Sequence, residues 1–129
     1  MISQLYGYIF ARSFRGERVP QHVQNIVLRD YCSKHEKELF LAAVEYAMPN
    51  SFVVLNSLID QMNSSTGLIF YSLCQLPESF EMRTEIYQRI LNSSSVIHFA
   101  VENCIVNSLE SAQNLERIIQ IRDLLKIEL

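Results

Sequence analysis

The feature that most constrains the fold is a fourfold alternation of short apolar runs with longer stretches that carry an apolar residue at every third or fourth position. The short runs are typical of buried strands, and the longer stretches are typical of amphipathic helices. Strands that alternate with helices through short loops predict a parallel sheet with helices on both faces. We therefore expect one α/β domain over residues 1–129, a three-layer sandwich whose mainly parallel sheet has four to five strands.

The boundaries of these elements follow from the apolar runs and from capping residues. Asn50 or Ser51 is expected to cap the second helix and Ser79 the third. The strand order is expected to be 2-1-3-4, and residues 104–106 form either a fifth short strand or a loop. The expected strands are residues 5–11, 39–47, 67–73 and 96–101, and the expected helices are residues 19–36, 50–62, 79–91 and 108–125.

Charge and composition argue against several classes of protein. The chain has 11 Lys and Arg against 14 Asp and Glu. It contains no block of basic residues of the kind that binds nucleic acid. No apolar run approaches the roughly 20 residues of a membrane helix, and arginines follow the first apolar run instead of preceding it, unlike in a signal peptide. Cys32, Cys74 and Cys104 form no CxxC motif, which argues against a disulfide framework and a zinc site. We expect a cytoplasmic protein with no membrane partner, metal or cofactor.

Polar residues follow each of the four expected strands. Because the carboxyl ends of parallel strands share one edge of a sheet, and ligands bind there in open α/β sheets, these residues form a candidate site. The two tyrosines among them either stack on a sugar or base or pack at the rim of the core. In strand order, the residues are Arg12, then Glu45 and Tyr46, then Tyr71, Ser72 and Gln75, then Glu102.

The loop after the first strand is rich in arginine and amide side chains. Arg12, Arg15 and Arg18 suit an anion, because guanidinium groups match the geometry of phosphate and carboxylate. The helix that begins near Pro20 would add free N–H groups. The alternative is that some of these arginines are solvated charges paired with Glu17. Five polar residues are expected to form hydrogen bonds with hydroxyl groups of the ligand: Gln21, Gln24, Asn25, Ser72 and Gln75.

Three titratable residues are candidates for proton transfer. Glu45 ends an apolar strand, where a carboxylate needs a partner, so it is either a general base or half of a salt bridge with Arg12. The imidazole of His22 suits proton transfer near neutral pH, and the alternative is a surface histidine. Glu102 also lies at the end of its strand. No motif indicates a dinucleotide or P-loop site.

Four short motifs in the first 105 residues have a characteristic spacing: Gly7-Tyr8, Ala11-Arg12, Tyr31-Cys32, and Tyr71-Ser72-Leu73 with Leu76. They resemble motifs of the catalytic domain of serine recombinases, the resolvases and invertases. In that family the nucleophilic serine lies two positions after the arginine, where this chain has Phe14, and the later charged cluster falls on residues 74–78. The fold is expected to be resolvase-like or flavodoxin-like, without recombinase activity.

A second resemblance covers nearly the whole chain. It rests on the run from Gly7 to Asn25, on Glu45-Tyr46-Ala47-Met48-Pro49, on Tyr71 to Pro77, and on His98-Phe99-Ala100-Val101-Glu102. These segments are similar to the sporadic carbohydrate cluster protein family, small bacterial proteins encoded within surface-polysaccharide gene clusters. The resemblance implies a role in making or modifying a surface glycan such as lipopolysaccharide.

The leading hypothesis is an enzyme that acts on an anionic sugar or nucleotide-sugar intermediate. Arg12 and Arg18 would hold the anion, while Glu45, with His22 or Glu102, would move protons. The alternative is a non-catalytic accessory protein that binds a sugar intermediate or a partner enzyme. Self-association as a homodimer through the leucine-rich last helix is expected by analogy.

Overall fold

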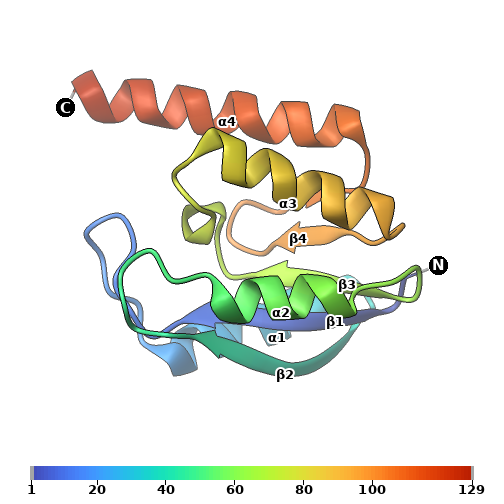
Figure 1. Ribbon diagram of the computed structural model, residues 1–129. Helices are drawn as coiled ribbons and strands as arrows, with labels where there is room; N and C mark the ends of the chain where they lie inside the picture. Colours follow the sequence, from blue (N-terminus) through green and yellow to red (C-terminus); the bar gives the residue numbers. More distant parts are fainter. Residues whose placement is uncertain (1, 129) are drawn as a thin grey trace.

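The computed structural model describes residues 2–128, with all side chains except those of Leu41 and residues 126–128. Met1 and Leu129, the two ends of the expected domain, lie outside the described residues. Strands and helices alternate along the chain, as the sequence predicts (Figure 1). The elements are β1 Gln4–Phe10, α1 Gln21–Lys34, β2 Glu38–Glu45, α2 Val53–Gln61, β3 Thr66–Phe70, the 3₁₀ turn η1 Leu73–Gln75, α3 Phe80–Asn92, β4 Ile97–Phe99, β5 Cys104–Val106 and α4 Leu109–Glu128.

The sheet has the strand order β2-β1-β3-β4-β5. The first four strands are parallel, and β5 pairs antiparallel with β4. The order expected for the first four strands is confirmed, and the segment that the sequence left ambiguous is a fifth strand. The connection from β4 to β5 is too short for a parallel crossover, so the chain turns back as a hairpin.

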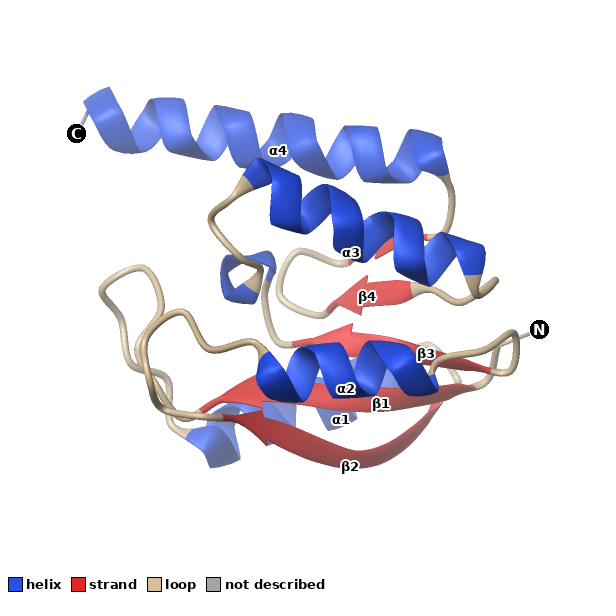
Figure 2. Ribbon diagram, in the orientation of Figure 1, coloured by secondary structure: helices blue, strands red, loops and turns tan. Residues whose placement is uncertain are grey.

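Helices cover both faces of the sheet, which confirms the three-layer sandwich (Figure 2). Side chains alternate between the two faces along β1. Leu5 and Ile9 pack with Leu28 of α1 on one face, while Tyr8 and Phe10 join the larger core beneath α2 and α3 on the other. Helix α4 packs against α3 and against β5, the strand at the edge of the sheet opposite β2 (Figure 1).

Gly7 is required by a close approach between β1 and β2. The pairing runs from Tyr6 opposite Phe40 to Tyr8 opposite Ala43, so β2 holds one extra residue at this point, a β-bulge. A Cβ added to Gly7 would lie 2.9 Å from the Cβ of Ala42. A side chain at position 7 would therefore push the two strands apart.

The starts of the helices agree with the sequence for α3 and differ for α2. Ser79 caps α3 as expected, and its hydroxyl accepts a hydrogen bond from the backbone N–H of Met82. The expected cap of the second helix at Asn50 or Ser51 is wrong: α2 begins at Val53, and no side chain caps it from the preceding residue. Within residues 2–128, no helix combines the length and the apolar character that crossing a bilayer requires.

Candidate active or binding site

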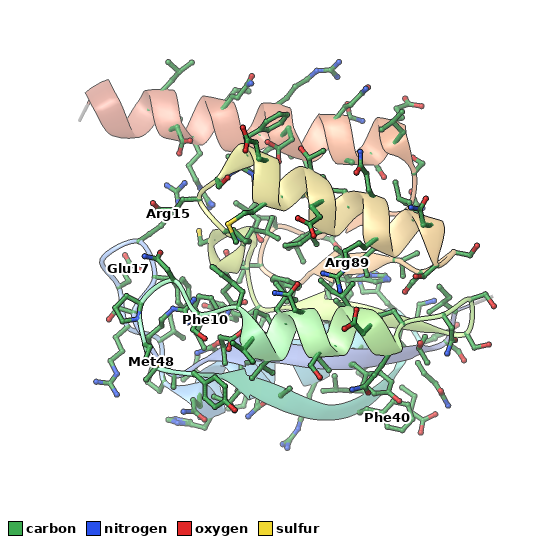
Figure 3. All side chains as sticks on the ribbon, viewed as in Figure 1. Phe10, Arg15, Glu17, Phe40, Met48 and Arg89 are labelled. Atoms are coloured by element: carbon green, nitrogen blue, oxygen red, sulfur yellow. The ribbon has the colours of Figure 1, made fainter. Side chains whose placement is uncertain are left out.

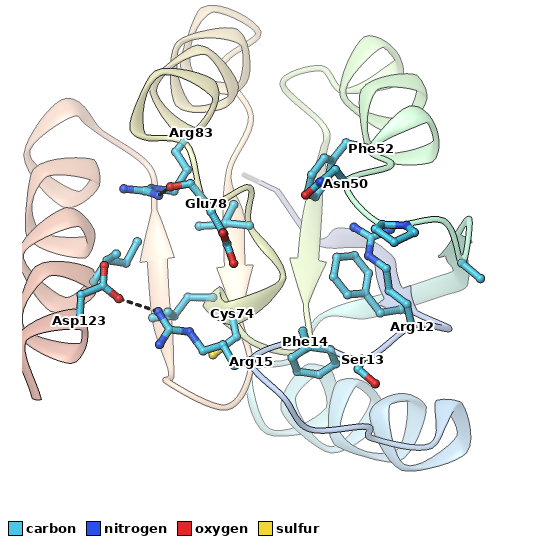
Figure 4. Close-up of a pocket in the computed structure, with 16 residues that line it drawn as sticks. Arg12, Ser13, Phe14, Arg15, Asn50, Phe52, Cys74, Glu78, Arg83 and Asp123 are labelled. Carbon is cyan, nitrogen blue, oxygen red and sulfur yellow. Dashed lines mark hydrogen bonds and ion pairs between the residues drawn. The ribbon is translucent and has the colours of Figure 1, made fainter. Parts of the chain in front are cut away.

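A cleft of about 650 Å³ opens at the carboxyl ends of β1, β2 and β3, and we call it the strand-end cleft (Figure 4). Its walls are the loop after β1, the loop after β2, the segment around η1, and helices α3 and α4. The location is the one that the sequence predicts for a ligand. The lining residues are Phe10, Arg12, Ser13, Phe14, Arg15, Ala47, Pro49, Asn50, Phe52, Leu73, Cys74, Leu76, Glu78, Arg83, Ile119 and Asp123.

The loop after β1 reaches the cleft through a tight turn. Phe14 and Glu17 exchange two backbone hydrogen bonds of 2.9 and 3.1 Å, and the two residues between them, Arg15 and Gly16, have φ angles of 52° and 74°. Positive φ at both central positions is characteristic of type I′ hairpin turns, which favour Asn-Gly. Arginine is an uncommon residue in this conformation, which costs a residue with a Cβ about 1–2 kcal/mol.

The side chain of Arg15 crosses the cleft mouth to helix α4. Its Nη2 donates to Oδ1 of Asp123 at 2.9 Å, and Figure 4 draws this ion pair. The Asp123 side chain is 57% exposed, so water screens the pair. Exposed ion pairs of this kind contribute about 0–1 kcal/mol, so a ligand anion could replace Asp123 at little cost.

Arg12 is fixed on the opposite side of the cleft by its own chain. Its Nη1 donates to the carbonyls of Tyr46 at 2.9 Å and Met48 at 3.3 Å. Its guanidinium carbon lies 4.1 Å from the ring centroid of Phe10 and 5.1 Å from that of Phe52, both cation–π distances. One of the two roles expected for Glu45 was a salt bridge with Arg12. That expectation is wrong, because backbone carbonyls and aromatic rings hold Arg12 instead.

Glu45 has a structural environment that explains its burial without an arginine. Its side chain is 1% exposed. Oε1 accepts from the Tyr8 hydroxyl at 2.9 Å and the Leu55 N–H at 3.1 Å, and Oε2 accepts from the Tyr46 and Val54 N–H groups. The carboxylate thus caps helix α2 from a neighbouring strand, where the helix dipole also favours a negative charge. Burial, and then the charge of Glu45, raise the pKa of Tyr8 well above its usual range.

Gln24 and Gln75 form a buried amide network behind the cleft. The amide of Gln24 donates to the carbonyls of Phe10 and Val19, each at 2.9 Å, and accepts from the Phe10 N–H at 3.0 Å. Gln75 donates to Gln24 at 2.9 Å and accepts from the backbone N–H of Ser72. These contacts fix the end of β1 and the turn after β3, which supports the cleft from behind.

Glu102 fixes the same turn from the other side. It accepts from the Ser72 hydroxyl at 2.7 Å and from the Leu73 N–H at 2.9 Å. Arg122 of α4 lies 3.6 Å from this carboxylate and places its Nη1 2.8 Å from the sulfur of Cys74. Glu102, one of the residues expected to act in the site, thus joins the turn after β3 to helix α4.

The remaining candidates lie away from the strand-end cleft. Gln21 and Asn25 line a separate, smaller cleft of about 210 Å³ between α1 and β2. His22 and Arg18 are exposed and line neither of these two clefts. The two tyrosines also differ: Tyr46 is 54% exposed, whereas the half-buried Tyr71 packs edge-on against Phe14 with ring centroids 6.0 Å apart.

Several cleft residues were not predicted from the sequence. Glu78, Cys74 and Asp123 were not among the expected site residues, and only the packing of α4 against the sheet brings Asp123 to the cleft. Arg83 also reaches the cleft, but its guanidinium is occupied, with two contacts of 2.8 and 2.9 Å to the Glu116 carboxylate. Burial alone would raise the pKa of Glu116, but hydrogen bonds from Arg83 and Tyr87 outweigh it and lower that pKa.

The arrangement can bind an anion and stack on a planar or ring-shaped group, because guanidinium and aromatic side chains line the same cleft. Two of them, Phe10 and Arg15, are labelled in Figure 3. Among the residues that the structure describes, no three His, Cys, Asp or Glu side chains gather closely enough to hold a metal ion.

Comparison with solved structures finds recombinases of the resolvase type. A resolvase family site-specific recombinase from Streptococcus pneumoniae matches with a TM-score of 0.66 and 9% sequence identity, over 96% of this chain and 92% of that chain. The N-terminal catalytic domain of TP901-1 integrase matches with a TM-score of 0.54 and 12% identity, over 94% of this chain and 96% of that chain. At these identities the likeness shows the fold alone, and it confirms the resolvase-like expectation. No protein-family model matches the sequence, and no curated protein matches it.

Proposed function

We propose that this chain binds a small anionic sugar or nucleotide sugar in the strand-end cleft, as a component of bacterial surface-polysaccharide biosynthesis. The observation that carries the binding proposal is the setting of Arg12. Among the described residues, its hydrogen bonds use Nη1 alone, and two aromatic rings lie against its guanidinium. The pathway is inferred only from the resemblance of segments 7–25, 45–49, 71–77 and 98–102 to the sporadic carbohydrate cluster family, and no family model matches the chain.

A fixed guanidinium is suited to an anion. The carbonyls that hold Nη1 set the orientation of Arg12 in advance, so Nε and Nη2 can meet a phosphate or carboxylate without losing further side-chain freedom. Phe14 and Phe52 line the cleft and add aromatic contact area for a sugar or base, and Arg15 adds a second cation at the cleft mouth. The volume of about 650 Å³ lies within the range typical of small-molecule sites.

Binding without catalysis fits the contacts better than the enzymatic hypothesis does. Glu45 and Glu102 give their carboxylate oxygens to backbone and hydroxyl donors inside the fold, and His22 lies outside the cleft. We therefore favour the accessory role, in which the domain holds a sugar intermediate for another enzyme. The proposed location is the cytoplasm, which the free cysteines Cys32 and Cys104 support, since reducing compartments favour unpaired thiols.

An enzyme that uses the same ligand is the second candidate. The observation in its favour is that a carboxylate and a thiol, those of Glu78 and Cys74, line the strand-end cleft. Either group would need a partner that activates it for chemistry. Chemical change of a bound nucleotide sugar, followed by NMR and lost in Glu78→Gln, would favour this candidate over the accessory role.

The test is a thermal-shift screen of purified protein against nucleotide sugars, sugar phosphates and sugar acids. A ligand at 100 times its Kd adds about 2.7 kcal/mol to the free energy of unfolding, which raises Tm by several degrees. We expect a shift with the wild type that is lost in Arg12→Gln, each variant being compared with its own ligand-free Tm.

Arg117→Gln is the matched control, because this exposed arginine of α4 bonds Asn114 and does not line the cleft. A shift that survives Arg12→Gln would move the binding site elsewhere, and the absence of any shift across the screen would overturn the binding proposal. The pathway is tested separately: cells that carry Arg12→Gln should produce less surface glycan than cells that carry Arg117→Gln.

The proposal includes a homodimer formed through α4. Three apolar side chains near the end of this helix, Ile121, Leu124 and Leu125, are 56–63% exposed. A second copy of the chain would remove them from water, which is favourable.

A further inference from the structure

The two ends of the strand-end cleft carry opposite charges. Figure 4 shows Glu78 pointing into the cleft from the segment before α3, while Arg12 lies on the far side beside Phe52. Arg15 and Asp123 neutralise each other on the α4 side of the cleft. The cleft is therefore not a uniformly positive anion site: it has an anionic end and a cationic end.

The charge of Glu78 is not compensated by the arginine nearest to it in sequence. Arg83 donates to the backbone carbonyls of Pro77 and Glu78 and places its remaining nitrogens on the Glu116 carboxylate. Among the described residues, the exposed carboxylate of Glu78 takes part in no hydrogen bond or ion pair. A carboxylate that faces a cleft in this way attracts a cation or a hydrogen-bond donor.

Aromatic side chains line the same cleft. In Figure 4, Phe52 lies beside Arg12, and Phe14 lies near Ser13 and Arg15. A pyranose ring that packs on these side chains would place one substituent near Arg12 and another near Glu78. Such a ligand would be held by ring contacts and by charge at both of its ends.

We propose that the ligand is amphoteric: an amino sugar with a free ammonium group that also bears a phosphate or carboxylate. The ammonium group pairs with Glu78, and the anionic group pairs with Arg12. This inference rests on the proposed function and narrows its ligand class. A neutral N-acetyl group in place of the ammonium group would leave Glu78 without its partner, so the cleft discriminates against N-acetylated sugars.

The experiment compares three probes by isothermal titration calorimetry at mildly acidic pH, where a sugar amine is protonated: glucosamine 6-phosphate, N-acetylglucosamine 6-phosphate and glucose 6-phosphate. We expect glucosamine 6-phosphate to bind about tenfold more tightly than the other two, as one charge-assisted contact predicts. In Glu78→Gln the ratio of the affinities for glucosamine 6-phosphate and glucose 6-phosphate should fall to about one.

The matched control is Glu81→Gln, because Glu81 is exposed in the first turn of α3 and does not line the cleft. Equal affinities of the three probes for the wild type would overturn the amphoteric ligand and leave the anion site intact. A preference that persists in Glu78→Gln would overturn the role of this carboxylate. Failure of all three probes, together with a negative nucleotide-sugar screen, would overturn the proposed function itself.

Discussion

The hydroxyl of Tyr31 lies 2.7 Å from Nδ1 of His98, and this contact joins helix α1 to strand β4 inside the smaller core. The Tyr31 ring also stacks on His35. Burial raises the pKa of Tyr31 to about 12, so the tyrosine stays a neutral hydrogen-bond partner at physiological pH. Burial, followed by the positive charge of Lys37 and of His35, lowers the pKa of His98 to about 4.

This pair makes stability depend on pH. Because the folded-state pKa of His98 lies below the unfolded value of about 6.5, the unfolded chain binds a proton that the folded chain does not. The stabilisation is complete above about pH 6.5 and is lost as the pH falls toward 4, at up to about 1.4 kcal/mol per pH unit. Urea denaturation between pH 7.5 and about pH 5 measures it, and His98→Gln should flatten the profile relative to the wild type. An unchanged slope in His98→Gln would show that other groups set the pH dependence.

Glu45→Gln should destabilise the fold by about 2–3 kcal/mol, because an amide cannot accept all the hydrogen bonds that the buried carboxylate accepts from Tyr8 and from the start of α2. The free energy of unfolding from urea denaturation is the measurement. Glu38→Gln, at the exposed start of the same strand, is the control and should change stability by less than about 0.5 kcal/mol. Equal effects of the two substitutions would contradict the capping role of Glu45.

Gln24→Ala should cost about 2–3 kcal/mol, because it leaves the buried N–H and carbonyl of Phe10 without their partner. Gln21→Ala, at the exposed first residue of the same helix, should have little effect. We also expect Gln24→Ala to weaken ligand binding, since Phe10 lines the cleft. Full stability in Gln24→Ala would mean that water replaces the amide without loss.

Two glycines should respond to alanine for different reasons. Gly7→Ala places a Cβ 2.9 Å from that of Ala42, and overpacking of this kind costs about 1–3 kcal/mol. Gly16→Ala meets open space but must adopt a φ of 74°, which costs about 1 kcal/mol. Urea denaturation should rank Gly7→Ala as the more damaging change, and the reverse order would disprove the tight contact between β1 and β2.

The homodimer is tested by multi-angle light scattering. We expect the wild type to elute at twice the mass of the chain, and Leu124→Glu to shift the protein to monomer, because it places a charge among the exposed apolar side chains of α4. Gln113→Glu, which changes an exposed polar residue of the same helix, should leave the dimer intact. A wild type that is monomeric at high concentration would rule the dimer out.

The order and type of the strands and helices can be predicted from the sequence, because the spacing of apolar residues reflects which face of each element is buried. The start of α2 does not, because its cap is the side chain of Glu45, which belongs to another element and lies nine residues before Val54. Local capping rules examine neighbouring residues, so they select Ser51, whose hydroxyl instead donates to the same carboxylate.

A cleft lies at the strand ends, where the sequence predicts the site, but only some of the expected residues line it. Arg12 and Arg15 line the strand-end cleft, whereas Gln24 and Glu102 bond to backbone groups inside the fold. An amide or carboxylate at a strand end can form hydrogen bonds with a ligand or with the protein's own backbone. Which of the two it does depends on the groups that the fold places next to it. Asp123 is 108 positions from Arg15 in the chain, so no local pattern connects them.

The bulge opposite Gly7 lies in β2, which is an edge strand of the sheet. An edge strand exposes unpaired backbone N–H and C=O groups, to which a strand of another molecule can pair. The extra residue in β2 breaks the regular spacing of those groups midway along the strand. An incoming strand would therefore meet an irregular edge, and β-bulges at sheet edges are one of the means by which proteins disfavour pairing with other chains.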